Sequence, residues 1–261
     1  MRVLHVVVLL LAMTGLAKAE VACLVIAEAA TGAVVHSEGD GCDDGIGPAS
    51  SFKFPLAVMG FDAGVLTSPD EPAWPYRSRY EAVRAIDRET TSPRRWLKES
   101  VLWFSHVLVA DLGAERFARY VRDFGYGNAD VSGDPGAGNG MTHAWLNTSL
   151  QITPNEQLGF VRRFLTGQLP VSRAALVQTV AAMPHFAAGD WDMQGKTGTG
   201  YVKEANGKRG KRQFGWFVGW ASRADTVLAF AYLQKNSKPG GNALGLRTRD
   251  DLLARWTDLV E

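Results

Sequence analysis

A serine and a lysine stand three residues apart, at Ser50 and Lys53, where a glycine-rich loop gives way to an apolar segment. Three residues are close to one helical turn, so the two side chains would share a helix face. A serine hydroxyl becomes an effective nucleophile only when a base lies within hydrogen-bond reach. Lys53 can be that base, or carry it, once burial or covalent change neutralises an amine whose usual pKa is about 10.4. Phe52 and Phe54 favour a dry setting, and N–H groups at the helix start favour an oxyanion beside Ser50.

The same pair has a second interpretation, in which Ser50 caps a helix and Lys53 is a solvated lysine one turn later. A Ser-x-x-Lys pattern is expected on the order of once by chance in a chain of this length. It occurs once here, at Ser50. The pattern alone therefore leaves both interpretations open.

Residues 195–200 read Gly-Lys-Thr-Gly-Thr-Gly and form a second group with chemical potential. Lys196 and Thr197 suit an anionic ligand, and the glycines would let a ligand approach the strand backbone closely. An exposed lysine at a glycine-rich strand end is the alternative. A Walker phosphate loop is excluded because its Gly-x-x-x-x-Gly-Lys-Ser/Thr pattern is absent. Ser105-His106 supplies another hydroxyl, but adjacent side chains diverge and no Gly-x-Ser-x-Gly elbow is present, so a Ser-His-Asp triad is not predicted.

A chain of 261 residues, 46% of them hydrophobic, can bury a sizeable core as one large domain or two intimate lobes. Strand-like runs open and close the chain, at residues 21–27, 33–36, 191–201, 213–220 and 227–234. Helix-like segments are residues 53–61, 96–109, 115–124, 172–183, one from Thr153 and one from Thr248. A basic segment at 203–212 is the predicted hairpin tip. The simplest arrangement is one antiparallel sheet built from both ends, with a helical lobe across a cleft.

Residues 1–19 combine a basic start, an apolar run and the small-x-small ending Ala17-Lys18-Ala19. This pattern predicts a secretory signal peptide cleaved before Glu20. No segment is long and apolar enough for a comfortable membrane span. The chain has 28 basic and 27 acidic residues, so losing Arg2 and Lys18 would leave a net charge of about −1. Neither nucleic acid nor stable membrane insertion is predicted for a near-neutral chain.

Cys23 and Cys42 are the only cysteines. An even number in an exported protein permits a disulfide, and because both lie near the N-terminal hairpin, a Cys23–Cys42 bridge is predicted. Two free thiols are the alternative. There is no Cys-x-x-Cys, and the five histidines lack ligand spacing, so no metal site is predicted.

Four motifs occur in the order and rough spacing of the class D serine β-lactamases, the oxacillinases, which the mature chain resembles over nearly its whole length. They are Ser50-x-x-Lys53, Ser105-x-Val107, Tyr126-Gly127-Asn128 and Lys196-Thr197-Gly198. Ser105-His106-Val107 replaces the Ser-Asp-Asn of class A, which argues against that class. The resemblance implies an α/β fold of the α+β type, the serine β-lactamase/transpeptidase-like fold. Residues 20–58 and 186–261 would form a sheet lobe and residues 59–185 a helical lobe.

The resemblance also implies catalytic roles. Ser50 would attack the lactam carbonyl, and Lys53, carboxylated by CO2 to N6-carboxylysine, would be the general base for acylation and deacylation. Trp145 would hydrogen-bond the carbamate and Val107 would keep it dry, while Ser105 would pass a proton to the lactam nitrogen. Because a carbamate forms only from a neutral amine, the pocket must lower the pKa of Lys53 by desolvation.

The substrate-binding residues follow from the same resemblance. The N–H groups of Ser50 and Thr199 would form the oxyanion hole, and Lys196, Thr197 and Arg247 would bind the substrate carboxylate. Arg249 is a rival for this last role. The full expected binding set is Tyr126, Lys196, Thr197, Gly198, Thr199 and Arg247. No cofactor is implied apart from the CO2 that modifies Lys53.

The resulting expectation is an exported, periplasmic hydrolase whose partners are β-lactam small molecules. A penicillin-sensing domain that stays acylated and a D,D-peptidase are the alternatives. Trp145 and the apolar Val107 favour turnover, because they support the carbamate that deacylation needs. The sequence leaves open the substrate range, the effect of His106 and the oligomeric state. A homodimer is one of the oligomeric states that it allows.

Overall fold

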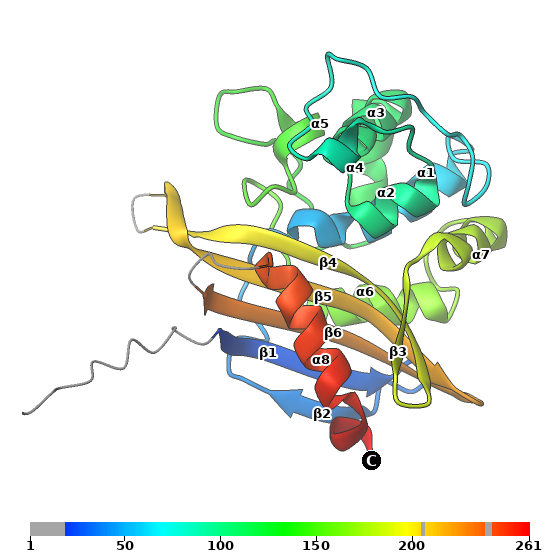
Figure 1. The fold of residues 1–261 in the computed structure, drawn as a ribbon, viewed down its shortest axis with the longest axis vertical. Coiled ribbons are helices and arrows are strands. Elements are labelled where there is room, and N and C mark those ends of the chain that lie inside the picture. The colour runs from blue at the N-terminus through cyan, green and yellow to red at the C-terminus, as the bar shows by residue number, and fades with distance from the viewer. Residues whose placement is uncertain (1–18, 205–206, 238–241) are drawn as a thin grey trace, which may run out of the picture.

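The structure is a computed structural model that describes residues 19–204, 207–237 and 242–261 (Figure 1). The predicted signal peptide, residues 1–19, lies outside this part except for its last residue. No described helix has the length and apolar character needed to cross a bilayer.

A single six-stranded sheet forms the centre of the fold, with the strand order β2-β1-β6-β5-β4-β3 and every neighbouring pair antiparallel. The strands are β1 Glu20–Glu28, β2 Val34–Glu38, β3 His185–Ala188, β4 Trp191–Lys203, β5 Arg209–Arg223 and β6 Thr226–Ser237. Residues 214–221 and 228–233 are buried throughout because β5 and β6 lie in mid-sheet with both faces covered. The prediction of one antiparallel sheet made from both chain ends is confirmed.

Helices cover both faces of this sheet. They are α1 Lys53–Asp62, α2 Pro93–Glu99, α3 Leu102–Leu112, α4 Ala114–Asp123, α5 Gly140–His143, α6 Pro154–Leu165, α7 Arg173–Ala182 and α8 Leu244–Val260, with 3-10 turns η1 Ala49–Phe52 and η2 Ala85–Arg88. The C-terminal α8 crosses one face, where Leu252 and Trp256 pack on Phe230 (Figure 1). On the opposite face, α6 packs on β6 and β1 although its residues fall within the predicted helical lobe.

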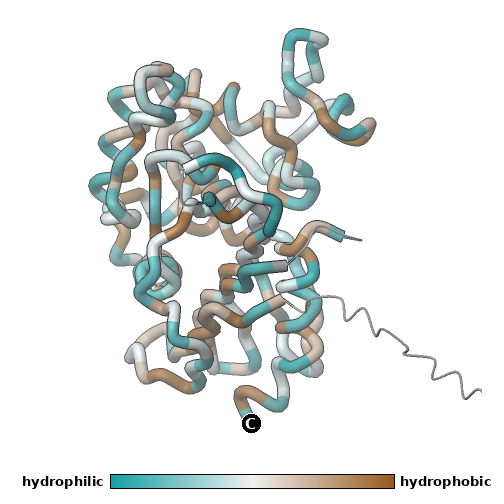
Figure 2. The backbone as a smooth tube through the Cα atoms, turned by 90° about the vertical axis from the view of Figure 1, so that its left-hand side faces the viewer, coloured by the Kyte–Doolittle hydropathy of each residue, from teal (hydrophilic) through white to brown (hydrophobic). Residues whose placement is uncertain are grey.

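The main core lies between the sheet and the remaining helices and contains α1, which is buried from Lys53 to Phe61. Figure 2 shows hydrophobic segments in both the sheet and the helical part, and one cluster of buried residues draws on strands and helices alike. The nearly all-apolar composition of α1 thus fits its central place. This helix carries the Ser50–Lys53 pair into the middle of the molecule.

The structure corrects three details of the predicted elements. The helix expected over 96–109 is two helices, because Ser100 adopts a left-handed conformation with φ of 61°. Thr248 does not cap α8: it is buried inside this helix, and its hydroxyl donates to Gln234 Oε1 and the Leu244 carbonyl. The short strand β3 was not predicted. By contrast, Thr153 caps α6 in a reciprocal pair with Glu156, as expected.

Cys23 and Cys42 form a disulfide, with Cα atoms 5.0 Å apart. The bridge ties β1 to the loop that leads from β2 toward Ser50. The prediction of a bridge, rather than two free thiols, is confirmed.

Candidate active site

Ser50 lies in the turn η1, immediately before α1. The preceding residue, Ala49, has a positive φ of 50°, which strains a residue with a side chain. Two contacts hold this turn: the Ala49 N–H donates to the Trp145 carbonyl at 2.9 Å, and β4 packs directly against it at Gly198. A Cβ atom on Gly198 would lie 2.7 Å from the Pro48 carbonyl oxygen, so only glycine allows this approach.

Lys53 points back along the helix face to Ser50, and its Nζ lies 3.0 Å from Ser50 Oγ. The lysine is 1% exposed, whereas Ser50 is half-buried and lines a cleft. Burial lowers the pKa of Lys53 to about 7, with a smaller contribution from the positive charge of Arg84 and an opposing one from Asp87. The uncharged amine is therefore far more accessible at neutral pH than in an ordinary lysine. The solvated-lysine interpretation is excluded by this burial.

Two side chains near the turn that carries Ser50, Trp145 and His106, each have a buried nitrogen without a hydrogen-bond partner among the described residues. Trp145 is fully buried and stacked on Phe52, and its Nε1–H meets no acceptor among the described residues. The ring of His106 lies 6.0 Å from that of Trp145, and its buried Nε2 has no hydrogen-bond partner among the described residues either. Burial, and then the charge of Lys53, lower the pKa of His106. Since buried donors are rarely left unsatisfied, the Trp145 N–H marks a place for an acceptor.

Ser105 is fully buried on α3, and its Oγ accepts a hydrogen bond from Trp96 Nε1 at 2.9 Å. This contact leaves the hydroxyl proton of Ser105 available to another acceptor. Val107, two residues along the same helix, is half-buried against the main core. Lys196 is 2% exposed on β4 and donates to Ser100 Oγ and to the Thr197 carbonyl. Burial, reinforced by nearby positive charges, lowers its pKa.

One edge of β4 forms a wall of the cleft. The Gly195 N–H points to the β3 side of the strand, where it donates to the Pro184 carbonyl. Because main-chain groups alternate sides along an antiparallel strand, the N–H groups of Thr197 and Thr199 face the same side. In the described part of the chain, β3 pairs with β4 only as far as Gln194. The two threonine N–H groups therefore face the cleft instead of another strand.

Tyr126 was predicted to bind substrate, but its side chain is fully buried and does not reach the cleft. Its hydroxyl donates to Gln157 Oε1 at 3.0 Å, and Gln157 Nε2 donates to Ser51 Oγ at 3.1 Å. Ser51 in turn donates to the Pro48 carbonyl. Tyr126 thus ends a hydrogen-bond chain that supports the turn carrying Ser50 from behind.

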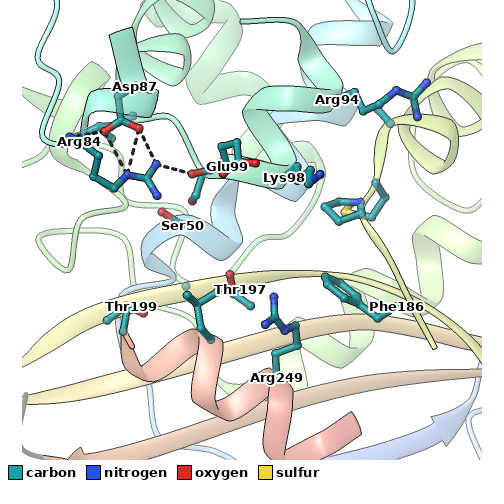
Figure 3. A pocket seen from close by; sticks show the side chains of 18 of the residues that line it. Ser50, Arg84, Asp87, Arg94, Lys98, Glu99, Phe186, Thr197, Thr199 and Arg249 are labelled. Atoms are coloured by element: carbon teal, nitrogen blue, oxygen red, sulfur yellow. Dashed lines mark hydrogen bonds and ion pairs between the residues drawn. The ribbon is translucent and has the colours of Figure 1, made fainter. Parts of the chain in front are cut away.

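The cleft has a volume of about 750 Å³. Figure 3 shows Ser50 between two walls: Arg84, just before η2, and Glu99 at the end of α2 on one side, and β4 with Thr197 and Thr199 on the other. Arg249 rises from α8 into the cleft, whereas the predicted Arg247 is not among the residues that line it. Residues two apart on a helix point about 200° apart, so only one of the two arginines can face the cleft.

Sequence reasoning missed Arg84 and Asp87. Arg84 donates to both Asp87 oxygens and to the Glu99 carbonyl, so it is fixed on the cleft wall. The segment 67–95 carries no motif, and its polar composition indicated only a surface loop. No group of three metal-ligating side chains occurs in the ranges that the structure describes.

The chain also resembles known proteins along most of its length. Residues 22–255 match the family model of the penicillin binding protein transpeptidase domain. The chain is 42% identical to the β-lactamase OXA-9 of Klebsiella pneumoniae over 245 residues, which cover 91% of this chain and 88% of OXA-9. It belongs to the class D β-lactamases. The β-lactamase OXA-1 of Escherichia coli is 32% identical over 76% of this chain and 70% of its own.

A crystal structure titled OXA-427 class D β-lactamase superimposes on this class D β-lactamase with a TM-score of 0.85 and 39% sequence identity. The match covers 90% of this chain and 97% of that one. The predicted family, the transpeptidase-like fold and the assignment as a serine hydrolase are thereby confirmed. The roles of individual residues rest on the geometry described above.

Proposed function

We propose that this protein hydrolyses β-lactam antibiotics through an acyl-enzyme on Ser50, with a CO2-carboxylated Lys53 as general base. The observation that carries the proposal is the 3.0 Å contact between Ser50 Oγ and a lysine that is 1% exposed with a pKa of about 7. An ordinary lysine would be neutral in roughly one molecule in 2,500 at pH 7. Burial therefore makes available the neutral amine with which CO2 reacts.

The surroundings of Lys53 fit a carbamate. When present, this group supplies an oxygen base with a negative charge. The Trp145 N–H, buried and without an acceptor, would donate to one of its oxygens. Arg84 would stabilise its charge, since the guanidinium field already reaches Lys53. Val107 would exclude water that favours loss of CO2.

The remaining groups account for acyl transfer. As Ser50 Oγ bonds to the lactam carbonyl carbon, its proton leaves toward the base beside it, and the carbonyl oxygen gains negative charge. The N–H groups of Ser50 and Thr199 would stabilise that charge. Ser105, which accepts from Trp96, would donate its own proton to the departing lactam nitrogen and would take up in exchange the proton that the base received from Ser50, so that the base is again unprotonated. For deacylation, the same base would take a proton from water as the water attacks the ester.

The β4 wall would orient the substrate. Thr197 and Arg249 face the cleft on the side of Ser50 away from Thr199, where a β-lactam carboxylate would lie. Arg249 is therefore the proposed carboxylate anchor in place of Arg247. The buried amine of Lys196 would also attract the substrate carboxylate. Export to the periplasm is part of the proposal, and the Cys23–Cys42 disulfide supports an oxidising location.

Turnover of the chromogenic cephalosporin nitrocefin tests the proposal. The wild-type protein should hydrolyse many equivalents, and Ser50→Ala should abolish this activity. Lys53→Met should slow turnover by about 10²–10⁴-fold, the usual contribution of a general base, and leave any acyl-enzyme trapped on Ser50. Matched controls are Ser37→Ala on the exposed edge strand β2 and Lys211→Met on the surface of β5.

The same experiment separates the alternatives. A burst of one equivalent without turnover would indicate a penicillin-sensing domain, and cleavage of a D-alanyl-D-alanine peptide would indicate a D,D-peptidase. Normal turnover by Lys53→Met would contradict the assignment of the base.

A further inference from the structure

The cleft extends along β4 well beyond the reacting centre. Thr199 lies beside Ser50, Thr197 follows toward the start of the strand, and β3 then pairs with residues 191–194. Pro184 and Phe186 continue the lining in that direction. The proposed carboxylate position at Thr197 is thus in the middle of the cleft, and a second compartment lies past it.

The α2 helix forms the opposite wall of this compartment. At its C-terminal end, Ser100 accepts a hydrogen bond from Lys196 Nζ at 3.2 Å, which places this end across from the middle of β4. Near its start, Arg94 donates to the Ala181 carbonyl at the end of α7. Lys98 lies between these two contacts and lines the cleft with an exposed side chain.

Two of the three basic side chains that line this compartment are paired with carboxylates, and the third is not. Arg94 is paired with Asp70, and Arg249 with Asp250. Lys98 forms no ion pair with any residue that the structure describes.

Glu99, the next residue of α2, forms no ion pair with Lys98. Glu99 lies at the Ser50 end of the cleft, beside Arg84, as Figure 3 shows. Lys98 is therefore a cation without a counterion at the mouth of the compartment.

The remaining lining suits a flat, partly apolar group. The half-buried Phe186 ring packs edge-on against Phe217, and the Arg249 guanidinium carbon lies 5.0 Å from its centre. Met183 and Pro184 complete this side. An aromatic substituent could stack beside Phe186 and Arg249 while an anionic edge turns toward Lys98.

We propose that this compartment is a subsite for the substituent on the ring carbon next to the β-lactam carboxylate, and that Lys98 makes it selective for substituents with negative charge. In cephalosporins this is the substituent at C3. The inference rests on the proposed function, because the position of the carboxylate fixes which substituent enters the compartment. Lys98 is thereby a specificity-determining residue for one class of substrate: dianionic cephalosporins.

Ceftriaxone and cefotaxime test the inference because they share one acyl side chain. Ceftriaxone carries an acidic heterocycle at C3, whereas cefotaxime carries a neutral acetoxymethyl group. Each is measured as a competitor of nitrocefin turnover, so an apparent inhibition constant is obtained however fast the competitor is hydrolysed. The proteins compared are wild type, Lys98→Met, which removes the charge but keeps a long unbranched side chain, and the control Lys211→Met.

Lys98→Met should raise the apparent inhibition constant of ceftriaxone about two- to fivefold relative to that of cefotaxime, the range expected for loss of a solvent-exposed ion pair. The difference should shrink in 0.5 M salt, where the screening length is roughly half its physiological value. Lys211→Met should leave the ratio of the two constants unchanged.

An unchanged ratio in Lys98→Met, or an equal shift in Lys211→Met, would overturn the subsite assignment while leaving the proposed function intact. Absence of nitrocefin turnover by the wild-type protein would instead refute the proposed function itself.

Discussion

Replacing Trp145 by phenylalanine isolates the hydrogen bond that the carbamate is expected to receive. The indole N–H is buried without an acceptor among the described residues, and its ring stacks on Phe52, the neighbour of the buried Lys53. A hydrogen bond to a charged group contributes about 1.5–3 kcal/mol. Trp145→Phe should therefore raise the bicarbonate concentration needed for half-maximal activity by roughly 10- to 150-fold.

The assay is a bicarbonate titration of nitrocefin turnover at constant pH, in protein first depleted of CO2. The ¹³C NMR signal of a carbamate formed from labelled bicarbonate provides a second measurement that does not depend on turnover.

Trp256→Phe is the matched control for this substitution. Trp256 is also fully buried, and its Nε1 has no partner among the described residues. It belongs to α8, however, and packs on the other face of the sheet. Both variants lose similar volume and similar stability, so only an effect on the carbamate separates them. A folded Trp145→Phe protein with the bicarbonate requirement of the wild type would refute the reasoning.

Three further outcomes are expected. Because Lys53 must be neutral to react and has a pKa of about 7, activity without added bicarbonate should fall as the pH drops through 7, and bicarbonate should restore part of it in pH–rate profiles. Gly198→Ala should reduce nitrocefin kcat by about 10²-fold, because its Cβ would displace the turn at Pro48 and misplace the nucleophile. Removing the disulfide with Cys23→Ala and Cys42→Ala should lower the free energy of unfolding by about 3 kcal/mol in urea titrations, the loop-closure value for some 20 residues.

Each of these outcomes has a contrary result. An acid limb well above or below pH 7 would contradict the assignment of that limb to Lys53. Gly159→Ala in α6 is the control for Gly198→Ala, since nothing lies within 4 Å of its added Cβ. Equal losses of kcat in both glycine variants would exclude the steric explanation. Unchanged urea stability after removal of the disulfide would show that packing alone fixes the loop before Ser50.

The reactive pair and the sheet were predictable from the sequence because their signals are local. Ser50 and Lys53 are one helical turn apart in a continuous apolar segment, so periodicity placed them on one buried face. The sheet followed from strand-like runs at the two chain ends, and Thr153 with Glu156 marked the start of α6. Such features depend on residues a few positions apart.

The cleft walls were harder to predict because they depend on tertiary packing. Choosing between Arg247 and Arg249 requires the rotation of α8, and the misplaced start at Thr248 left that rotation undetermined. Tyr126 was assigned to substrate because a motif gives order along the chain but not the direction of a side chain. Arg84 becomes a cleft residue only through its contacts with Asp87 and the Glu99 carbonyl, fifteen positions away.

The unpaired edge of β4 also bears on how this enzyme could change its substrates. On that side, the proposed oxyanion contact comes from the peptide N–H of Thr199, which every amino acid except proline provides, so mutations at Thr199 would alter that contact only indirectly. The α2 side presents Lys98 and Arg84 through their side chains alone. Variation should therefore accumulate on the helical side, where a new substituent can be accommodated without disturbing the groups that activate the carbonyl.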